Sequence, residues 1–257
     1  MRTLNTLIVI LLATTSLHAL NNDTLLQIAE KIWKNECNGT IEGLVSWNAG
    51  EEFASVGIGH FIWYPKDKRG PFKETFPALL LFFEEHHVVL PTWLKSGSFC
   101  LWNSREEFLT KKNAAEMQEL RQLLKNTIHL QAKFILKRFE SAVSELTQGL
   151  YSPEKTHIEA QLKRLQASDN GTYALIDYLN FKGEGTDPTE RYQGHGWGLI
   201  QVLELMPGTS ADPIKEFISA AKEVLARRVK SAPKERNEQR WLAGWFHRLE
   251  TYQLSFY

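Results

Sequence analysis

The sequence has few cysteines and no excess of charge of either sign. Its 257 residues include 2 cysteines, and 30 Lys and Arg residues balance 30 Asp and Glu residues, so the formal net charge is zero. A chain without a positive excess has no overall field that attracts nucleic acid or anionic lipid. We therefore predict no nucleic-acid partner.

Several motifs that carry catalysis or bind cofactors are also absent. The sequence contains no Gly-x-Ser-x-Gly elbow, no phosphate-binding loop and no Cys-x-x-Cys pair. Its one adjacent cluster of ligand-type residues, at positions 84–87, has no third group at ligand spacing, and neighbouring residues on a helix point apart. The sequence thus predicts no metal site and no cofactor, and gives no local support for a serine or cysteine nucleophile.

Long apolar runs are missing beyond the N-terminus. The run at residues 7–13 follows Arg2 and precedes small residues that end at Ala19, which is the pattern of a signal peptide over residues 1–19. No later segment approaches the ~20 apolar residues that a membrane helix needs. We expect an exported protein, periplasmic or extracellular, with no membrane span after signal cleavage. An uncleaved anchor is the alternative.

The two cysteines are Cys37 and Cys100. In an oxidising compartment, two cysteines are most simply explained as one disulfide, and we predict this pairing. Two buried free thiols are the alternative, because the sequence does not show whether the two Cα atoms come within bonding range.

Residues 20–257 are predicted to form a single domain, because a chain of this length with 43% hydrophobic residues can bury one substantial core. Apolar residues recur at helical spacing through most of it. Two β-forming runs flank a Gly-containing turn near the start, which predicts a short hairpin. The fold class is therefore mainly α (α+β), with a small β-hairpin near the N-terminus. The expected helices cover residues 23–36, 74–87, 114–125, 128–146, 152–166, 173–180, 197–206, 213–230 and 234–252, and a further short helix is expected to begin after Ser104. The expected hairpin strands cover residues 44–47 and 53–58.

Glu36 is the first candidate catalytic residue. It falls on the same face as the apolar positions Ile32 and Trp33 of the first predicted helix. Acidic residues are seldom buried without a partner, and desolvation raises the pKa of a carboxyl group. A raised pKa would keep a proton available near neutral pH, as a general acid requires. The alternative is a frayed last turn that leaves Glu36 in water.

Residues 47–65 combine carboxylates, glycines, an imidazole and several aromatic rings, a mixture that neither a core nor a plain loop requires. Flat apolar faces beside carboxylates suit sugar rings, so we interpret this stretch as the edge of an active site. Trp47, Trp63 and His60 are predicted to bind substrate. For His60, the alternative is a packed histidine that fixes the hairpin to a helix.

Two further features of this stretch have chemical implications. Gly57 and Gly59 lack Cβ, so the backbone there can lie close to another element or a ligand. Glu51 is our choice for a second catalytic carboxylate, with Glu52 beside it. A solvated turn is the alternative for both.

A second stretch comprises residues 177–185 and 190–202, and its second part carries three glycines together with aromatic and polar side chains. A turn would explain the glycines but not the aromatic and polar residues among them. We predict that this stretch lines the same cleft as the hairpin and that Tyr192, Trp197 and Gln201 bind substrate there.

A helix that ends in Glu, followed by a hairpin that ends Ser-Val-Gly-Ile-Gly-His at residues 55–60, resembles the lysozyme-like superfamily. It is most similar to phage-type lysozymes, whose hairpin carries a Thr-Ile-Gly-x-Gly-His segment. The resemblance implies a lysozyme-like helical domain, with Glu36 in the place of the catalytic acid and Ser55 in the place of the hydroxyl that helps hold the nucleophilic water.

Three other resemblances are more local. Glu42-Gly43-Leu44 looks like the Glu-Gly-Leu start of some phage lysozymes, which makes Glu42 a rival to Glu36 as the acid. Residues 198–201, Gly-Leu-Ile-Gln, are similar to the Gly-Leu-Met-Gln segment of lytic transglycosylases and goose-type lysozymes. Residues 47–65 also resemble a group of uncharacterised exported bacterial proteins, a likeness that names no reaction.

Two functions from different classes follow. The first is an exported enzyme that cleaves the glycan of peptidoglycan, by hydrolysis or by transglycosylation, with peptidoglycan or a related glycan as its partner. The second is a catalytically silent envelope protein that holds glycan or a protein partner in the same aromatic cleft.

Overall fold

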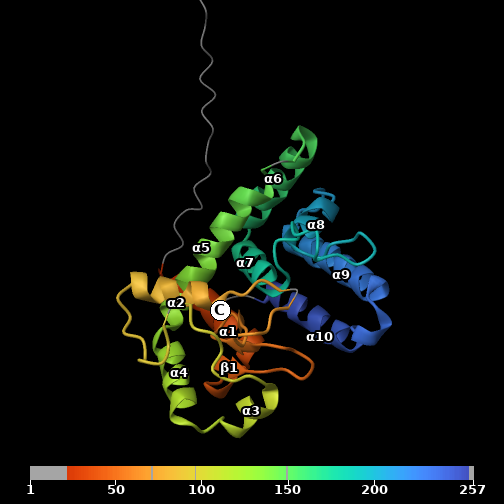
Figure 1. Cartoon of the computed structure of the whole chain (residues 1–257). Coiled ribbons are helices and arrows are strands. Elements are labelled where there is room, and N and C mark those ends of the chain that lie inside the picture. The colour runs from red at the N-terminus through yellow and green to blue at the C-terminus, as the bar shows by residue number, and fades with distance from the viewer. Residues whose placement is uncertain (1–21, 71, 96, 149, 255–257) are drawn as a thin grey trace, which may run out of the picture.

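The computed structural model describes residues 22–70, 72–95, 97–148 and 150–254. Within these residues the protein is mainly helical, with one small antiparallel sheet near the N-terminus (Figure 1). The predicted signal peptide, residues 1–19, lies outside the described residues. None of the helices within the described ranges combines the length and apolar character needed to cross a bilayer.

The helices follow the apolar periodicity of the sequence. The predicted bounds of α5 and α6 are confirmed at both ends, and most other helices differ by a few residues from their expected ranges. The helices are α1 (Asn22–Cys37), α2 (Phe76–Glu85), α3 (Arg105–Thr110), α4 (Ala115–Asn126), α5 (Ile128–Leu146), α6 (Ser152–Gln166), α7 (Gly171–Lys182), α8 (Leu199–Leu205), α9 (Pro213–Ser231) and α10 (Gln239–Glu250), with short 3-10 turns at Glu42–Leu44, Lys234–Arg236 and Thr251–Gln253.

Helix α1 buries one face, as its sequence predicts. Leu25, Ile28 and Ile32 are almost fully buried at three- and four-residue spacing. The helix ends at Cys37, and Asn38 then adopts a left-handed backbone with φ 53°, a conformation that asparagine tolerates at helix C-termini. The last turn of α1 is therefore ordered, and Glu36 lies in it.

The sheet has three strands where the sequence predicted two. Strands β1 (Val45–Ser46), β2 (Ala54–Val56) and β3 (Phe61–Trp63) pair antiparallel in the order β1-β2-β3. Ala54 faces Trp63 and Val56 faces Phe61 across the second pair. Strand β3 was missed because its residues were interpreted as aromatic contacts at the edge of the site and not as a strand.

Helix α5 is central to the packing. It contacts α1, α2 and α7, while α2 packs on β3 and α4 packs on β1. The helices α8, α9 and α10 gather on the other side of α7 (Figure 1). The end of the described chain returns to the beginning, because the backbone oxygen of Leu254 accepts hydrogen bonds from Lys31 Nζ at 2.8 Å and Asn170 Nδ2 at 3.0 Å. This return brings α10 beside the last turn of α1.

The predicted disulfide between Cys37 and Cys100 is wrong, since both cysteines are buried free thiols. The Cys37 thiol donates to the backbone oxygen of Gly57 at 3.4 Å. Cys100 instead lies beside the end of β3, where its amide donates to the oxygen of Tyr64 at 2.9 Å. Burial raises the pKa of the Cys100 thiol to about 12, so that it behaves as a small apolar side chain.

Candidate functional site

The site is built on the tight turn between β2 and β3. Gly57 has φ 75°, and a Cβ there would collide with Oε1 of Gln131 from α5. That same oxygen accepts the amide of Ile58 at 2.8 Å. On the other side of the turn, Nδ2 of Asn180 from α7 donates to the oxygen of Gly59 at 3.2 Å. The two glycines therefore let the turn lie against two helices, as their lack of Cβ predicts.

His60 follows the turn in a left-handed conformation, with φ 46°. Such a backbone is uncommon for a residue other than glycine and costs free energy, so the surrounding contacts must hold it in place. The conformation directs the imidazole toward the last turn of α1, where His60 Nδ1 lies 3.3 Å from Glu36 Oε2. The expected approach of Glu36 to the hairpin is confirmed.

Glu36 also belongs to a buried ion-pair network. Its Oε1 lies 2.8 Å from Nη2 of Arg248 on α10, and Arg248 also binds both carboxylate oxygens of Asp177 on α7 at 2.8 Å. Tyr252 donates to Asp177 at 2.7 Å. One guanidinium thus joins α1, α7 and α10 at the site.

The predicted rise in the pKa of Glu36 is wrong. Burial alone would raise its pKa, but Arg248 and His60 together hold it well below its usual range. Burial alone would likewise lower the pKa of His60, yet Cys37 and Glu36 raise it to about 10. At neutral pH the pair is therefore a carboxylate and an imidazolium, and the proton resides on His60.

The other candidate acids differ in their surroundings. Glu51 is half-buried, and burial together with the charge of Glu36 raises its pKa, while Asn48 and His60 lower it. Glu51 therefore lies close enough to the Glu36–His60 pair to interact with both charges. Glu42 and Glu52 are exposed, and Glu52 pairs with Lys68 at 2.7 Å. Of the other candidate acids, Glu51 is thus the one whose pKa is affected by the charges of Glu36 and His60.

A cavity of about 170 Å³ opens beside His60. It is bounded by the β2–β3 turn, by the C-terminal end of α7 and by residues from the second predicted stretch, including Trp197 and Glu190. The expectation that the two stretches line one cavity is confirmed. Neither Glu36 nor Glu51 is part of the wall, and Glu36 is connected to it through His60. The lining residues are Gly59, His60, Ile62, Phe72, Lys73, Thr75, Arg138, Leu179, Asn180, Phe181, Lys182, Gly183, Glu190, Trp197 and Arg228.

Several predicted site residues are buried next to the site and do not line its cavity. Trp47 is 5% exposed, and its Nε1 donates to the backbone oxygen of Glu51 at 2.8 Å, which positions the segment that carries this carboxylate. Trp63 is wholly buried and packs against Phe76. Ser55 is 3% exposed and faces Ile62 across the sheet. Neither Trp63 nor Ser55 lines the cavity.

The remaining predictions concern the second stretch. Tyr192 packs on Trp197 with ring centroids 4.6 Å apart and donates from its hydroxyl to Glu238 at 3.0 Å. Gln201 accepts the amide of Gly198 at 3.0 Å and donates to the oxygen of Gly185 at 3.1 Å. Of these predicted residues, Trp197 lines the cavity. Tyr192 packs on Trp197, and Gln201 connects the backbone of Gly185 and Gly198.

Sequence reasoning missed the cationic residues of the site. Arg248 joins Glu36 to Asp177, and Arg138, Lys182 and Arg228 line the cavity. Each lies on a helix whose apolar periodicity says nothing about pairing with a distant element. The one sequence signal that could have found them is a charged residue at a buried position of a helix. Lys182 is such a residue, and it lies within residues 177–185.

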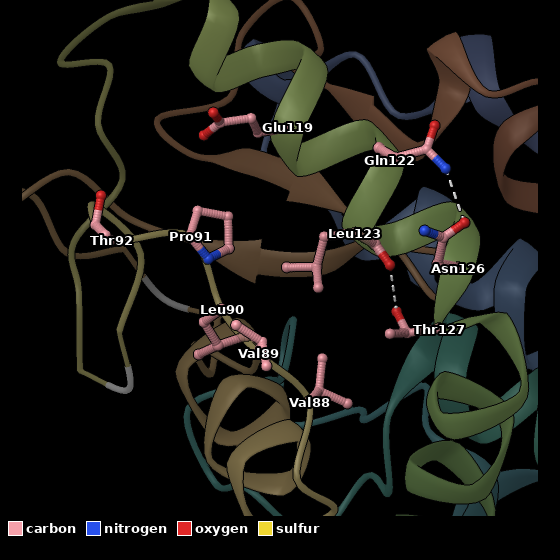
Figure 2. A pocket seen from close by; sticks show the side chains of 10 residues that line it. All are labelled: Val88, Val89, Leu90, Pro91, Thr92, Glu119, Gln122, Leu123, Asn126 and Thr127. Atoms are coloured by element: carbon pink, nitrogen blue, oxygen red, sulfur yellow. Dashed lines mark hydrogen bonds between the residues drawn. The ribbon is translucent and has the colours of Figure 1, made fainter.

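A larger hollow, of about 570 Å³, lies elsewhere, between residues 88–92 and α4 (Figure 2). Its walls are mostly apolar, and its one carboxylate, Glu119, accepts a hydrogen bond from Nε1 of Trp93 at 2.7 Å. None of the predicted site residues lines it. The hollow has no group placed for acid–base chemistry.

Searches for related proteins found no matching family model, no matching curated protein and no matching solved structure. Within the described ranges, His, Cys, Asp and Glu residues form no group of three or more that could hold a metal ion.

Proposed function

We propose that this protein is an exported, lysozyme-like enzyme that cleaves the glycan of peptidoglycan. One observation carries the proposal: the pKa of Glu51 is raised, in part by the charge of Glu36, whereas Arg248 and His60 hold the pKa of Glu36 well below its usual range. Paired carboxylates whose environments separate their pKa values are the usual means by which one site provides both an acid and a base. Glycoside cleavage needs this division of roles.

The pKa directions assign the roles in the free protein. Glu51, with its raised pKa, donates a proton to the glycosidic oxygen as the bond from that oxygen to the anomeric carbon breaks. Glu36, which is ionised, steadies the positive ring carbon or accepts the proton of the attacking water. In transglycosylation the sugar's own hydroxyl replaces that water. The sequence-based choice of Glu36 as the acid stays a prediction, and it requires Glu36 to take up a proton when substrate binds.

Two residues of the cavity wall carry buried polar atoms that a sugar hydroxyl would reach only if the wall shifts. Nε2 of His60 and Oδ1 of Asn180 are buried, and neither has a hydrogen-bond partner among the described residues. An imidazolium Nε2–H is a donor and an amide oxygen is an acceptor. A hydroxyl can accept from the first and donate to the second, which would satisfy two groups that are costly to leave unpaired.

A second function, a silent envelope protein that binds glycan without cutting it, is favoured by one observation. Both oxygens of Glu36 already lie beside cations, namely Arg248 at 2.8 Å and His60 at 3.3 Å. In this second function, the carboxylate of Glu36 ties α1 to α10 and takes no part in a reaction.

Digestion of purified peptidoglycan by single variants separates the two functions. We expect wild type to release soluble fragments and Glu51→Gln to release them at least ~100-fold more slowly, because general acid catalysis contributes ~10²–10⁴-fold. Glu36→Gln should be similarly slow. The control is Glu52→Gln, which alters the exposed neighbour of Glu51 and should keep the wild-type rate. If wild type binds the polymer but releases nothing, the enzymatic proposal fails.

A further inference from the structure

One side chain in the wall of the cavity beside His60, that of Lys182, plays no part in the proposed cleavage. Lys182 is the last residue of α7 and is 9% exposed, and its Nζ has no hydrogen bond or ion pair with another described residue. This nitrogen instead lies over the rings of Trp245, at 3.5 Å from the centroid, and Phe181, at 3.9 Å. A charged ammonium is costly to bury without a counter-ion, so this environment favours the neutral amine.

The carboxylates nearest in charge to Lys182 are already bound to arginines. Glu238 accepts from Nε and Nη2 of Arg228 at 2.7 and 2.9 Å, and Glu36 lies 2.8 Å from Nη2 of Arg248. Burial and the charges of Arg228 and Arg248 lower the pKa of the Lys182 amine well below its ordinary value. The charges of Glu238 and Glu36 act in the opposite direction and are outweighed. A larger share of Lys182 therefore carries a free lone pair, which makes the amine a nucleophile.

The rest of the wall favours an anion. Arg138, from α5, has no ion pair within the described residues, and its guanidinium stays charged near neutral pH although burial lowers its pKa. Lys73 and the imidazolium of His60 add positive charge, and the one acidic residue among those that line the cavity is Glu190, whose pKa is raised by burial. A guanidinium binds a carboxylate through two parallel hydrogen bonds. Arg138 can therefore hold the carboxylate of a ligand in the same cavity as the Lys182 amine.

The size of the cavity limits this ligand to a few atoms. Its volume of about 170 Å³ is smaller than the ~300–1,000 Å³ of pockets that enclose a drug-sized molecule. Trp197 and Phe72 add apolar surface to the wall. A small molecule that carries an electrophilic carbonyl carbon next to a carboxylate matches an amine and a guanidinium in one wall. The 2-oxo acids have this structure.

We propose that Lys182 is a nucleophile that forms an imine with a small 2-oxo acid, whose carboxylate is held by Arg138. The nitrogen lone pair attacks the carbonyl carbon, and the π electrons of the C=O bond move to the oxygen. The C–O bond then breaks, the oxygen leaves as water with the two hydrogens of the amine, and the C=N bond forms. The step consumes no oxidant or reductant. It is a second activity of the cavity, goes beyond the proposed glycan cleavage and does not depend on it.

Reductive trapping tests this assignment. Sodium cyanoborohydride adds hydride to the imine carbon and converts the linkage to a stable secondary amine. Wild type is incubated with pyruvate and cyanoborohydride at pH 7 and digested, and the labelled peptides are located by mass spectrometry. We expect at least ~10-fold more label on Lys182 than on Lys137, because an exposed lysine with an ordinary pKa is almost fully protonated at this pH.

Two variants test the roles of the two side chains. Lys182→Met should remove the label at this position, and Lys137→Met, which alters the exposed lysine on α5, should keep it. Arg138→Met should reduce labelling of Lys182 by pyruvate about tenfold, the effect of losing one charge-assisted hydrogen bond. The same variant should be labelled by butanone, a ketone of similar size without a carboxylate, to the same extent as wild type.

The peptide map of wild type locates the label directly, so the test does not depend on the folding of Lys182→Met. Label spread evenly over the exposed lysines, or none at Lys182, would overturn the assignment of the nucleophile. Equal labelling of wild type and Arg138→Met by pyruvate would overturn the assignment of the carboxylate contact, as would an equal loss of labelling by pyruvate and butanone in that variant.

Discussion

At the scale of single residues, the site is defined by a carboxylate whose charge is fixed by its neighbours. Glu36 lies on the buried face of α1, as its spacing from Ile32 and Trp33 predicts, yet its pKa is lowered where isolated burial would raise it. The reason is Arg248, which reaches Glu36 from α10. Desolvation is the largest single effect, but the charges and hydrogen bonds of Arg248 and His60 together outweigh it.

The pH dependence of stability tests the Glu36–His60 pair. The pKa of His60 rises from ~6.5 in the unfolded chain to about 10 in the folded protein. Its contribution to stability is therefore complete below pH ~6.5 and is lost as the pH rises through its folded pKa. We predict that His60→Gln lowers the free energy of unfolding by about 1–3 kcal/mol at pH 6 and that this difference disappears near pH 10.

Urea unfolding of wild type and His60→Gln at several pH values measures that difference directly. Lys182, whose lowered pKa gives the opposite trend with pH, is present in both proteins and cancels in the comparison. A difference that stays constant from pH 6 to pH 10 would show that His60 is not held as an imidazolium.

At the scale of elements, the turn between β2 and β3 is held by two helices. Gln131 from α5 accepts the amide of Ile58, and Asn180 from α7 donates to Gly59. The sequence predicts the two glycines and their close approach to another element. It could not predict which helices they approach, because those helices lie more than 70 residues further along the chain.

Substitution of Gly59 tests how closely the turn is packed. An alanine Cβ would lie 2.9 Å from the ring of Phe61 and 3.0 Å from Oδ1 of Asn180, so Gly59→Ala requires a shift of the turn. We predict that it lowers the free energy of unfolding by about 1–3 kcal/mol. Gly244→Ala is the matched control, because Gly244 is exposed inside α10 with no atom within 4 Å of the added Cβ. That control should stabilise the protein by ~0.5–1 kcal/mol, and equal effects at both positions would contradict the packing described.

Helix α10 is held at the site by the guanidinium of Arg248. In Arg248→Met, the wholly buried Asp177 loses its bidentate partner and Glu36 loses one of its two cations. We predict a loss of about 3–5 kcal/mol in the free energy of unfolding, the usual cost of breaking a buried ion pair. Arg240→Met, on the exposed side of the same helix, should cost less than ~0.5 kcal/mol. Thermal or urea unfolding measures both, and a loss below about 1 kcal/mol for Arg248→Met would show that the network is not a structural tie.

The elements themselves were predicted to different degrees. Long amphipathic helices such as α5 and α6 follow from periodicity, since each buries one face regardless of its partner. Strand β3 was not predicted, because its aromatic residues were interpreted as binding residues of the site. The disulfide between Cys37 and Cys100 was inferred from the expected compartment, and the structure separates the two thiols by placing one at the end of α1 and the other beside β3.

At the scale of the whole molecule, the fold gathers distant parts of a neutral chain into one cationic cavity. His60 comes from the sheet, Arg138 from α5, Lys182 from α7 and Arg228 from α9. Composition gives the net charge of the whole chain but does not show where each charged residue lies in the fold. The sequence therefore predicted that two stretches share a cavity, but not its charge.

The central claim is that this cavity and the adjoining carboxylates form a site that cuts glycan. Mass analysis of the fragments released from purified peptidoglycan tests it most directly. We predict that wild type yields fragments cut at glycosidic bonds, with reducing ends for hydrolysis or anhydro ends for transglycosylation, and that Glu51→Gln yields almost none. The absence of such fragments from wild type, or a yield from Glu51→Gln equal to that of wild type, would contradict the claim.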